Sequence, residues 1–127
     1  MTKNFTLAEM CHTNTGLINK PNETQHHYLR MLCEKVLQPI REAYGKPITV
    51  NSGFRSAAVN KAVGGVETSQ HTKGQAADIT CENNKELFDF IVKNKFTFDQ
   101  LIDEKNYRWL HISYVPNGNR QQILHIK

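Results

Sequence analysis

The chain has 127 residues, of which 39% are hydrophobic and 22% are charged, and its formal net charge at pH 7 is +4. This composition is that of an ordinary globular domain and excludes a largely disordered chain. No segment approaches the roughly 20 apolar residues of a membrane-spanning helix, and no basic run with interleaved aromatic residues indicates nucleic-acid binding. We therefore expect a single domain over residues 1–127, a monomer, with no nucleic acid and no membrane as partner.

The first half of the chain is predicted to be mainly helical. Apolar residues recur at helical spacing over residues 24–44, after Asn22, a residue type that caps helix N-termini. Pro39 lies inside this segment, where it is expected to kink the helix or to separate its last turn. Gly45 is expected to end the helix, and the β-branched residues in 48–50 predict a short strand after it.

Shorter elements are predicted in the second half. We expect helices over 57–63 and 84–95, and strands over 76–81, 98–103, 109–115 and 121–126. The last two strands are separated by the turn sequence PNGN. Helices early in the chain and turn-connected strands late in it are typical of an α+β domain. The pattern predicts helices packed on one side of a small antiparallel sheet.

Two histidines and one aspartate are candidates for a metal site. His71 lies in a polar loop, Asp78 in the predicted strand that follows it, and His111 in a later strand. Two imidazoles and one carboxylate are a common ligand set for catalytic zinc, which keeps a further position for water. Alternate side chains of a strand share a face, so His111 lies opposite its apolar neighbours. On these residues alone, ordinary surface or core roles for the three side chains stay open.

The surrounding sequence narrows this choice. The run SQHTKGQAAD at 69–78 resembles the SxHxxGxAxD signature of the zinc D-Ala-D-Ala peptidases, peptidase family M15, which share their fold with the Hedgehog signalling domain. VNSGFRS at 50–56, FDQLI at 98–102 and WLHIS at 109–113 resemble further segments of the same family, in the same order. The resemblance covers most of the chain, residues 5–115, and implies an α+β domain of the Hedgehog/DD-peptidase type.

The resemblance also implies a metal and an activity. His71, Asp78 and His111 match the three zinc ligands of the family one for one, so one Zn²⁺ ion is expected. Two neutral imidazoles and one carboxylate leave such a site with a net positive charge, which favours activation of a water molecule. The implied reaction is hydrolysis of an amide bond in the stem peptide of peptidoglycan. Its simplest form is release of the terminal D-Ala from a D-Ala-D-Ala end.

Two side chains are implied to act in catalysis. Glu104 is the implied general base and acid, because related sequences carry a glutamate a few residues before the third ligand. Asp103, its neighbour in the chain, is the alternative. Arg55 matches the arginine after the Ser-Gly pair of the family, and it is expected to stabilise the oxyanion or to bind the terminal carboxylate of the peptide. An ion pair at a helix start is the structural alternative for Arg55.

Three further residues are implied to contact the substrate or to orient the first ligand. Ser69 and Gln70 precede His71 and are expected to form hydrogen bonds to it or to the peptide. Trp109 shares the face of His111 and is expected to form a wall of the substrate cleft, with plain packing as the alternative. Some relatives have a histidine where this chain has Trp109, which gives Arg55 a larger expected share in catalysis.

Two other functions stay open at this stage. The protein is alternatively an endopeptidase, similar to an endolysin, that cuts an L-Ala-D-Glu bond or a cross-link of the same peptidoglycan. The loops that line the cleft set that choice, and the signature does not. A zinc-bearing binding module without catalysis is the other alternative. Glu104 and Arg55 beside three ligands favour an enzyme.

The expected compartment follows from the N-terminus and the cysteines. The first residues, MTKNFTLAEM, lack the apolar segment of a signal peptide. Cys11, Cys33 and Cys81 are odd in number and widely spaced, so we expect reduced thiols. The protein is therefore expected to be cytoplasmic as synthesised. An enzyme of a phage or prophage, which acts on the cell wall after release, fits this expectation.

Overall fold

The computed structural model describes residues Met1–Lys127. The helices are α1 (Leu7–Met10), α2 (Glu23–Leu32), α3 (Gln38–Tyr44), α4 (Ala57–Ala62) and α5 (Asn84–Lys93), with a π-helical segment η1 (Cys33–Leu37) and a 3₁₀ turn η2 (Gln70–Lys73). The strands are β1 (Thr49–Ser52), β2 (Ala76–Thr80), β3 (Gln100–Glu104), β4 (Trp109–Ser113) and β5 (Gln122–Ile126). None of the helices combines the length and the apolar character that a membrane crossing requires.

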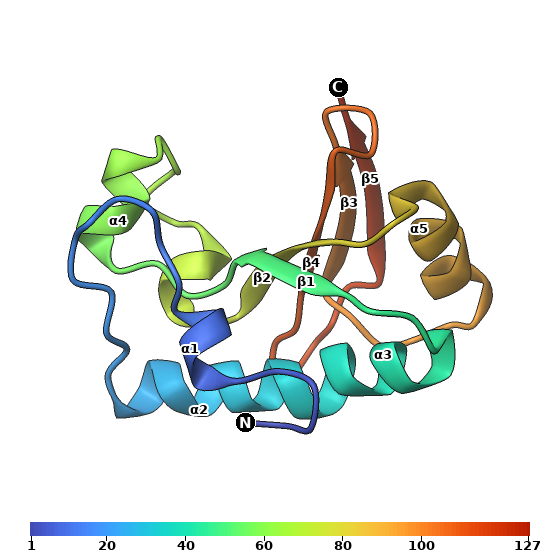
Figure 1. The fold of residues 1–127 in the computed structure, drawn as a ribbon, viewed down its shortest axis with the longest axis horizontal. Coiled ribbons are helices and arrows are strands. Elements are labelled where there is room, and N and C mark those ends of the chain that lie inside the picture. The colour runs from blue at the N-terminus through green and yellow to red at the C-terminus, as the bar shows by residue number, and fades with distance from the viewer.

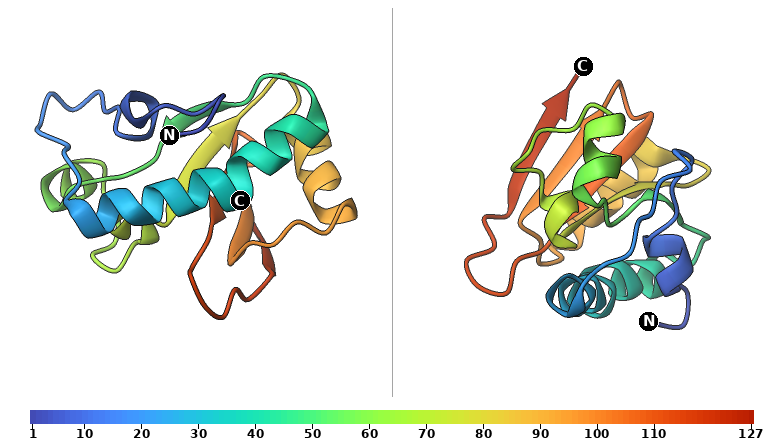
Figure 2. Two further views of the ribbon diagram at one scale, coloured as in Figure 1. Left: turned by 90° about the horizontal axis from the view of Figure 1, so that it is seen from below. Right: turned by 90° about the vertical axis from the view of Figure 1, so that its left-hand side faces the viewer.

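One long helical segment runs beneath the sheet (Figures 1 and 2). It consists of α2, η1 and α3 without a break, begins at the cap Asn22 and ends at Gly45, whose φ of 74° is left-handed. The predicted helix over 24–44 is therefore confirmed. Pro39 does not separate the last turn, because the π-helical segment directly before it accommodates the disturbance. Proline lacks an N–H donor and its ring crowds the carbonyl one turn earlier, so the helical hydrogen bonding beside it must change.

The sheet is mixed, with the strand order β1-β2-β4-β3-β5. The pairs β1–β2, β2–β4 and β3–β4 are antiparallel, whereas β3 and β5 are parallel. The α+β class is confirmed, but the predicted purely antiparallel sheet is wrong. The turn sequence after β4 does not form a hairpin between β4 and β5, which are not neighbours in the sheet.

The connection between β4 and β5 explains the parallel pair. After Ser113 the chain passes the start of β3, where the backbone N–H of Gln121 donates to Phe98 O at 3.1 Å and that of Gln122 donates to Asp99 O at 3.0 Å. A strand that begins beside the start of β3 and continues along it must run in the same direction. Tertiary contacts near Asp99 therefore override the local turn signal.

The two faces of the sheet have different side chains. On β2 and β4 the alternate residues Ala77, Ile79, Leu110 and Ile112 are fully buried in a hydrophobic cluster of 20 residues. Apolar side chains of the long helical segment, of α5, and of α1, β1 and β3 also belong to this cluster. The remaining positions of β2 and β4, which include Asp78 and His111, point to the other face. The helical layer therefore leaves one face of the sheet free for polar side chains.

Gly74 fixes the turn between η2 and β2. Its φ is +78°, and a Cβ atom at this position would lie 2.5 Å from the backbone oxygen of Gln25. Gly74→Ala is therefore expected to lower the free energy of unfolding by about 3 kcal/mol, from left-handed strain and backbone overlap together. Gly118→Ala is the matched control, because Gly118 has a φ of +80° but a Cβ atom there would meet no other atom within 4 Å. Urea denaturation of both variants compares them, and equal losses would contradict the proposed overlap.

Candidate metal centre

His71 is held in one tautomer by the backbone. It lies in η2, its side chain is buried, and its Nδ1 is 2.7 Å from the carbonyl oxygen of Gly53. A carbonyl oxygen only accepts, so Nδ1 carries the proton and donates it. Nε2, which lies 3.2 Å from Oδ1 of Asp78, is therefore the nitrogen available to a metal ion, which would take the place of the proton shared with that carboxylate. This arrangement is the one that a metal-binding histidine needs.

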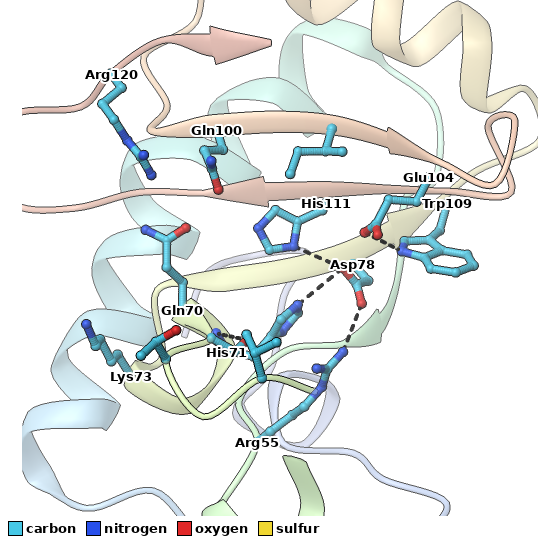
Figure 3. Close-up of a pocket in the computed structure, with 14 residues that line it drawn as sticks. Arg55, Gln70, His71, Lys73, Asp78, Gln100, Glu104, Trp109, His111 and Arg120 are labelled. Atoms are coloured by element: carbon cyan, nitrogen blue, oxygen red, sulfur yellow. Dashed lines mark hydrogen bonds and ion pairs between the residues drawn. The ribbon is translucent and has the colours of Figure 1, made fainter. Parts of the chain in front are cut away.

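Asp78 and His111 come from neighbouring strands. They are directly paired across β2 and β4, so their side chains leave the sheet on the same face. Nδ1 of His111 lies 3.3 Å from Oδ1 of Asp78. The two imidazole rings approach edge to face, with 5.1 Å between their centroids. Figure 3 shows the two rings on either side of the carboxylate.

The three side chains fit a single zinc ion. One ligand atom from each of His71, Asp78 and His111 lies within 4.8 Å of the other two. Zinc bonds to nitrogen and oxygen of roughly 2.0–2.2 Å in a tetrahedron place ligand atoms roughly 3.3–3.6 Å apart. Two of the three separations in the structure, 3.2 and 3.3 Å, already lie close to that range. The donor set, two imidazoles and a carboxylate, is also one that zinc prefers.

Asp78 is ionised in this environment. Burial opposes ionisation, but hydrogen bonds from His111 and His71 outweigh it, so the pKa of Asp78 lies well below its ordinary value. The second carboxylate oxygen is 3.2 Å from Nη2 of Arg55. A deprotonated carboxylate is the form that binds a metal, and Arg55 holds the oxygen that faces away from the histidines.

Arg55 has a full set of partners. Besides Asp78, its Nε donates to Ser52 Oγ at 3.0 Å and its Nη1 donates to Asn60 Oδ1 at 3.3 Å. The predicted residue does lie at the site, yet all three of its nitrogens are engaged by the protein. These contacts fit a residue that holds Asp78 in place better than they fit a cation that is free to bind the peptide.

Glu104 and Trp109 lie at another side of the same cleft. They are directly paired across β3 and β4, and the indole Nε1 of Trp109 donates to Glu104 Oε2 at 2.9 Å. Asp103, the alternative base, alternates to the other face of β3, where it is buried and bonded to His125. Of the two adjacent carboxylates, the structure therefore brings only Glu104 to the cleft.

The cleft around these residues has a volume of about 560 Å³. All of the residues predicted for the site line it: Arg55, Ser69, Gln70, His71, Asp78, Glu104, Trp109 and His111. Ser69 also fixes the first ligand, since its Oγ accepts a hydrogen bond from the backbone N–H of His71 at 3.2 Å. Sequence reasoning missed four polar lining residues, Thr68, Lys73, Gln100 and Arg120. The sequence around Arg120 did not indicate a site residue. Arg120 follows a turn, and where the chain goes after that turn depends on the pairing of β5 with β3.

Asp99 connects the cleft to the sheet. Its side chain is almost fully buried and accepts hydrogen bonds from Arg120, at Nε and Nη2, and from Gln70 Nε2 at 2.9 Å. The bonds from Arg120 lower the pKa of Asp99 from 3.8 to about 2. Gln70 lies in η2, so its hydrogen bond links Asp99 to the turn that carries His71.

The lowered pKa of Asp99 predicts a pH dependence. A carboxyl group with a lowered pKa in the folded state stabilises the fold above its ordinary pKa of 3.8, and this contribution is lost as the pH falls toward about 2. The unfolding free energy of metal-free protein is therefore expected to exceed that of Asp99→Asn at pH 6, with the difference shrinking between pH 4 and pH 2. Chemical denaturation at a series of pH values measures this. A difference that stays constant down to pH 2 would rule out the ion pair as its source.

The fold and the site together define a class: an α+β protein with a candidate three-ligand metal site in an open polar cleft. Residues 3–113 match the model of the Peptidase M15 family, and the chain belongs to this family. It is also similar to the zinc D-Ala-D-Ala carboxypeptidase of Streptomyces albus G, with 41% identity over 81 residues. The aligned part is 60% of this chain and 31% of that relative, so the chain matches about a third of the relative's length.

Proposed function

We propose that the protein is a zinc-dependent metallopeptidase that hydrolyses amide bonds in the stem peptides of peptidoglycan, in the manner of a D-Ala-D-Ala carboxypeptidase. The observation that carries this proposal is the convergence of His71 Nε2, Asp78 Oδ1 and His111 Nδ1 on one point beside Glu104. The relative from Streptomyces, a zinc D-Ala-D-Ala carboxypeptidase by name, supports the metal and the substrate class. The proposal includes a monomeric domain with the Hedgehog/DD-peptidase fold.

His71, Asp78 and His111 would hold one zinc ion, which supplies Lewis-acid activation of a water molecule and of the scissile carbonyl. Glu104 is the proposed proton carrier. One of its oxygens is held by Trp109 at 2.9 Å, which leaves the other free to accept the proton of the attacking water. The same carboxyl group then donates this proton to the leaving amine, and the new carboxylic acid passes its own proton to solvent. A carboxylate and an amine are thus released, and Glu104 is ionised again.

The other cleft residues position the reacting groups in this proposal. Arg55 orients Asp78 through its contact with the second carboxylate oxygen, and it supplies positive charge close to the oxyanion that develops on the carbonyl. Trp109 forms the wall beside Glu104 and limits where the peptide backbone runs. Ser69 and Gln70 fix the turn of the first ligand through their hydrogen bonds.

Mass spectrometry of defined stem peptides tests this function. The zinc-loaded protein is incubated with pentapeptide stems, shorter stems and cross-linked dimers, and Glu104→Gln serves as the blank. Loss of one alanine from the pentapeptide is the expected result. Cleavage of an internal or cross-linking bond would replace the carboxypeptidase with an endopeptidase. Unchanged masses for every substrate, with zinc bound, would overturn the enzymatic function in favour of a zinc-bearing binding module.

A further inference from the structure

The charged side chains of the cleft are unevenly distributed. Glu104 lies at the end of β3, whereas Gln100 lies at its start, so four residues of extended strand, about 13 Å, separate them. Gln70 and Arg120 both bind Asp99, the residue before Gln100. In Figure 3, Lys73, Gln70, Gln100 and Arg120 accordingly lie across His111 and Asp78 from Glu104 and Trp109. The cleft thus has an acidic end and a basic end, with the metal site between them.

Arg120 is presented to the cleft in a fixed orientation. Its Nε and Nη2 donate to the two oxygens of Asp99 at 3.0 and 2.8 Å, and its backbone N–H donates to the same carboxylate at 3.0 Å. Asp99 is 2% exposed, whereas the side chain of Arg120 is 55% exposed. Because the buried carboxylate of Asp99 binds one edge of the Arg120 guanidinium, the Nη1 group has no protein partner and is open to a ligand.

Lys73 adds positive charge at the same end. It lines the cleft, is exposed, and forms neither an ion pair nor a hydrogen bond to any carboxylate of the chain. Because Asp99 neutralises Arg120 and Asp78 neutralises Arg55, Lys73 is the uncompensated cation of the lining. The basic end of the cleft therefore combines one uncompensated charge, on Lys73, with one directed donor, on Arg120.

Two amide side chains complete this end of the cleft. The NH₂ group of Gln70 donates to Asp99, and the NH₂ group of Gln100 donates to Gln122 Oε1 at 2.7 Å. Each NH₂ group uses one of its two hydrogens in this way, and both carbonyl oxygens remain as acceptors. Cationic donors and amide acceptors together suit a peptide group with a carboxylate next to it.

We propose that Arg120 and Lys73 determine specificity by binding a free carboxylate of the substrate on one side of the scissile amide, with Asp99 as the residue that positions Arg120. This inference rests on the proposed function and deepens it. A stem peptide offers two such carboxylates, the terminal one and that of its D-glutamate residue. The shared chemistry is an anionic group within one or two residues of the amide that is cut.

Paired peptides that differ by one charge test this inference. The first pair is a pentapeptide stem with a C-terminal acid or a C-terminal amide, and the second pair carries D-glutamate or its amide, D-isoglutamine. Binding to zinc-loaded Glu104→Gln protein is measured by calorimetry, so that turnover does not interfere. In one of the two pairs, the acid is expected to bind about 10-fold more tightly than the amide, as a charge-assisted contact predicts. The pair that shows this difference identifies which carboxylate of the stem peptide is bound.

Substitutions in the same background assign the preference to residues. Arg120→Gln is expected to remove most of the preference for the acid over the amide. Lys73→Gln is expected to reduce this preference about 3-fold. It is also expected to make the preference less dependent on salt, because salt screens the exposed charge of Lys73. Arg30→Gln and Lys93→Gln remove the same charges from exposed positions outside the cleft and are expected to keep the preference. Lys73 forms no ion pair or hydrogen bond with Asp99, so its variant reports on recognition even where Arg120→Gln disturbs the fold.

Two results would overturn the inference. Equal binding of acid and amide in both pairs would exclude carboxylate recognition. Equal weakening of acid and amide by Arg120→Gln, with no effect of Lys73→Gln, would make the basic end a structural feature only. Neither result depends on hydrolysis, whereas failure of the wild-type protein to cut any stem peptide counts against the proposed function alone.

Discussion

Asp78→Ala is expected to abolish zinc binding and peptide hydrolysis together. Asp78 is the central member of the site, because one of its oxygens lies 3.2 Å from His71 and 3.3 Å from His111. Loss of a partner that merely orients a ligand already costs roughly 10–100-fold in metal affinity, so loss of the ligand itself is expected to cost more than about 100-fold. Zinc content after dialysis and the rate of alanine release measure the two effects on the same sample.

A second variant separates this effect from unfolding. Removal of the carboxylate leaves the mostly buried guanidinium of Arg55 without its ionic partner, which destabilises the fold by itself. His111→Ala removes a ligand but leaves the pair of Asp78 and Arg55 intact, and circular dichroism shows whether each variant is folded. A folded Asp78→Ala or His111→Ala protein that retains one tightly bound zinc would contradict the ligand assignment.

Glu104→Gln is expected to keep the metal and to lose most of the turnover. The substitution preserves the shape of the side chain and an oxygen for the hydrogen bond from Trp109, but it removes the group that accepts and donates the proton. Positioned proton transfer contributes roughly 10²–10⁴-fold to rates, and we expect kcat to fall by about that factor. Zinc content and KM are expected to change little.

Asp103→Asn is the matched control for this variant. The two carboxylates are adjacent in β3 but point to opposite faces, and Asp103 is buried beside His125. We expect Asp103→Asn to retain kcat within about threefold, because its side chain does not line the cleft. Normal hydrolysis by Glu104→Gln, or a large loss of kcat in a folded Asp103→Asn protein, would show that the base is assigned to the wrong residue.

The residues of the candidate metal centre could be proposed from the sequence because their geometry is largely local. His71 and Asp78 are joined by one short turn at Gly74 and a strand, and strand alternation places His111 on the polar face of β4. Direct pairing of Asp78 with His111 follows once β2 and β4 are neighbours. The resemblance to a known signature supplied the chemistry, and the structure brings these residues together.

The parallel strand and the basic end of the cleft could not be predicted in the same way. Both depend on Asp99, a buried carboxylate whose partners Arg120 and Gln70 are distant in sequence. The local signal at PNGN is that of a hairpin, and only these contacts direct the chain past β3 instead. The π-helical segment before Pro39 is a comparable case, because proline predicts a disturbance but not the form it takes.

A zinc titration of metal-free protein is the sharpest test that one zinc ion at His71, Asp78 and His111 is needed for hydrolysis. Chelator-treated protein is supplied with increasing zinc, and hydrolysis of the stem pentapeptide is measured at each step beside Asp78→Asn and Glu104→Gln. We expect the rate to rise in proportion to zinc and to level off at one zinc per chain. Glu104→Gln is expected to bind one zinc without hydrolysis, and Asp78→Asn is expected to do neither. Full activity in the presence of the chelator, or saturation with one zinc and no cleavage of any stem peptide, would contradict these expectations.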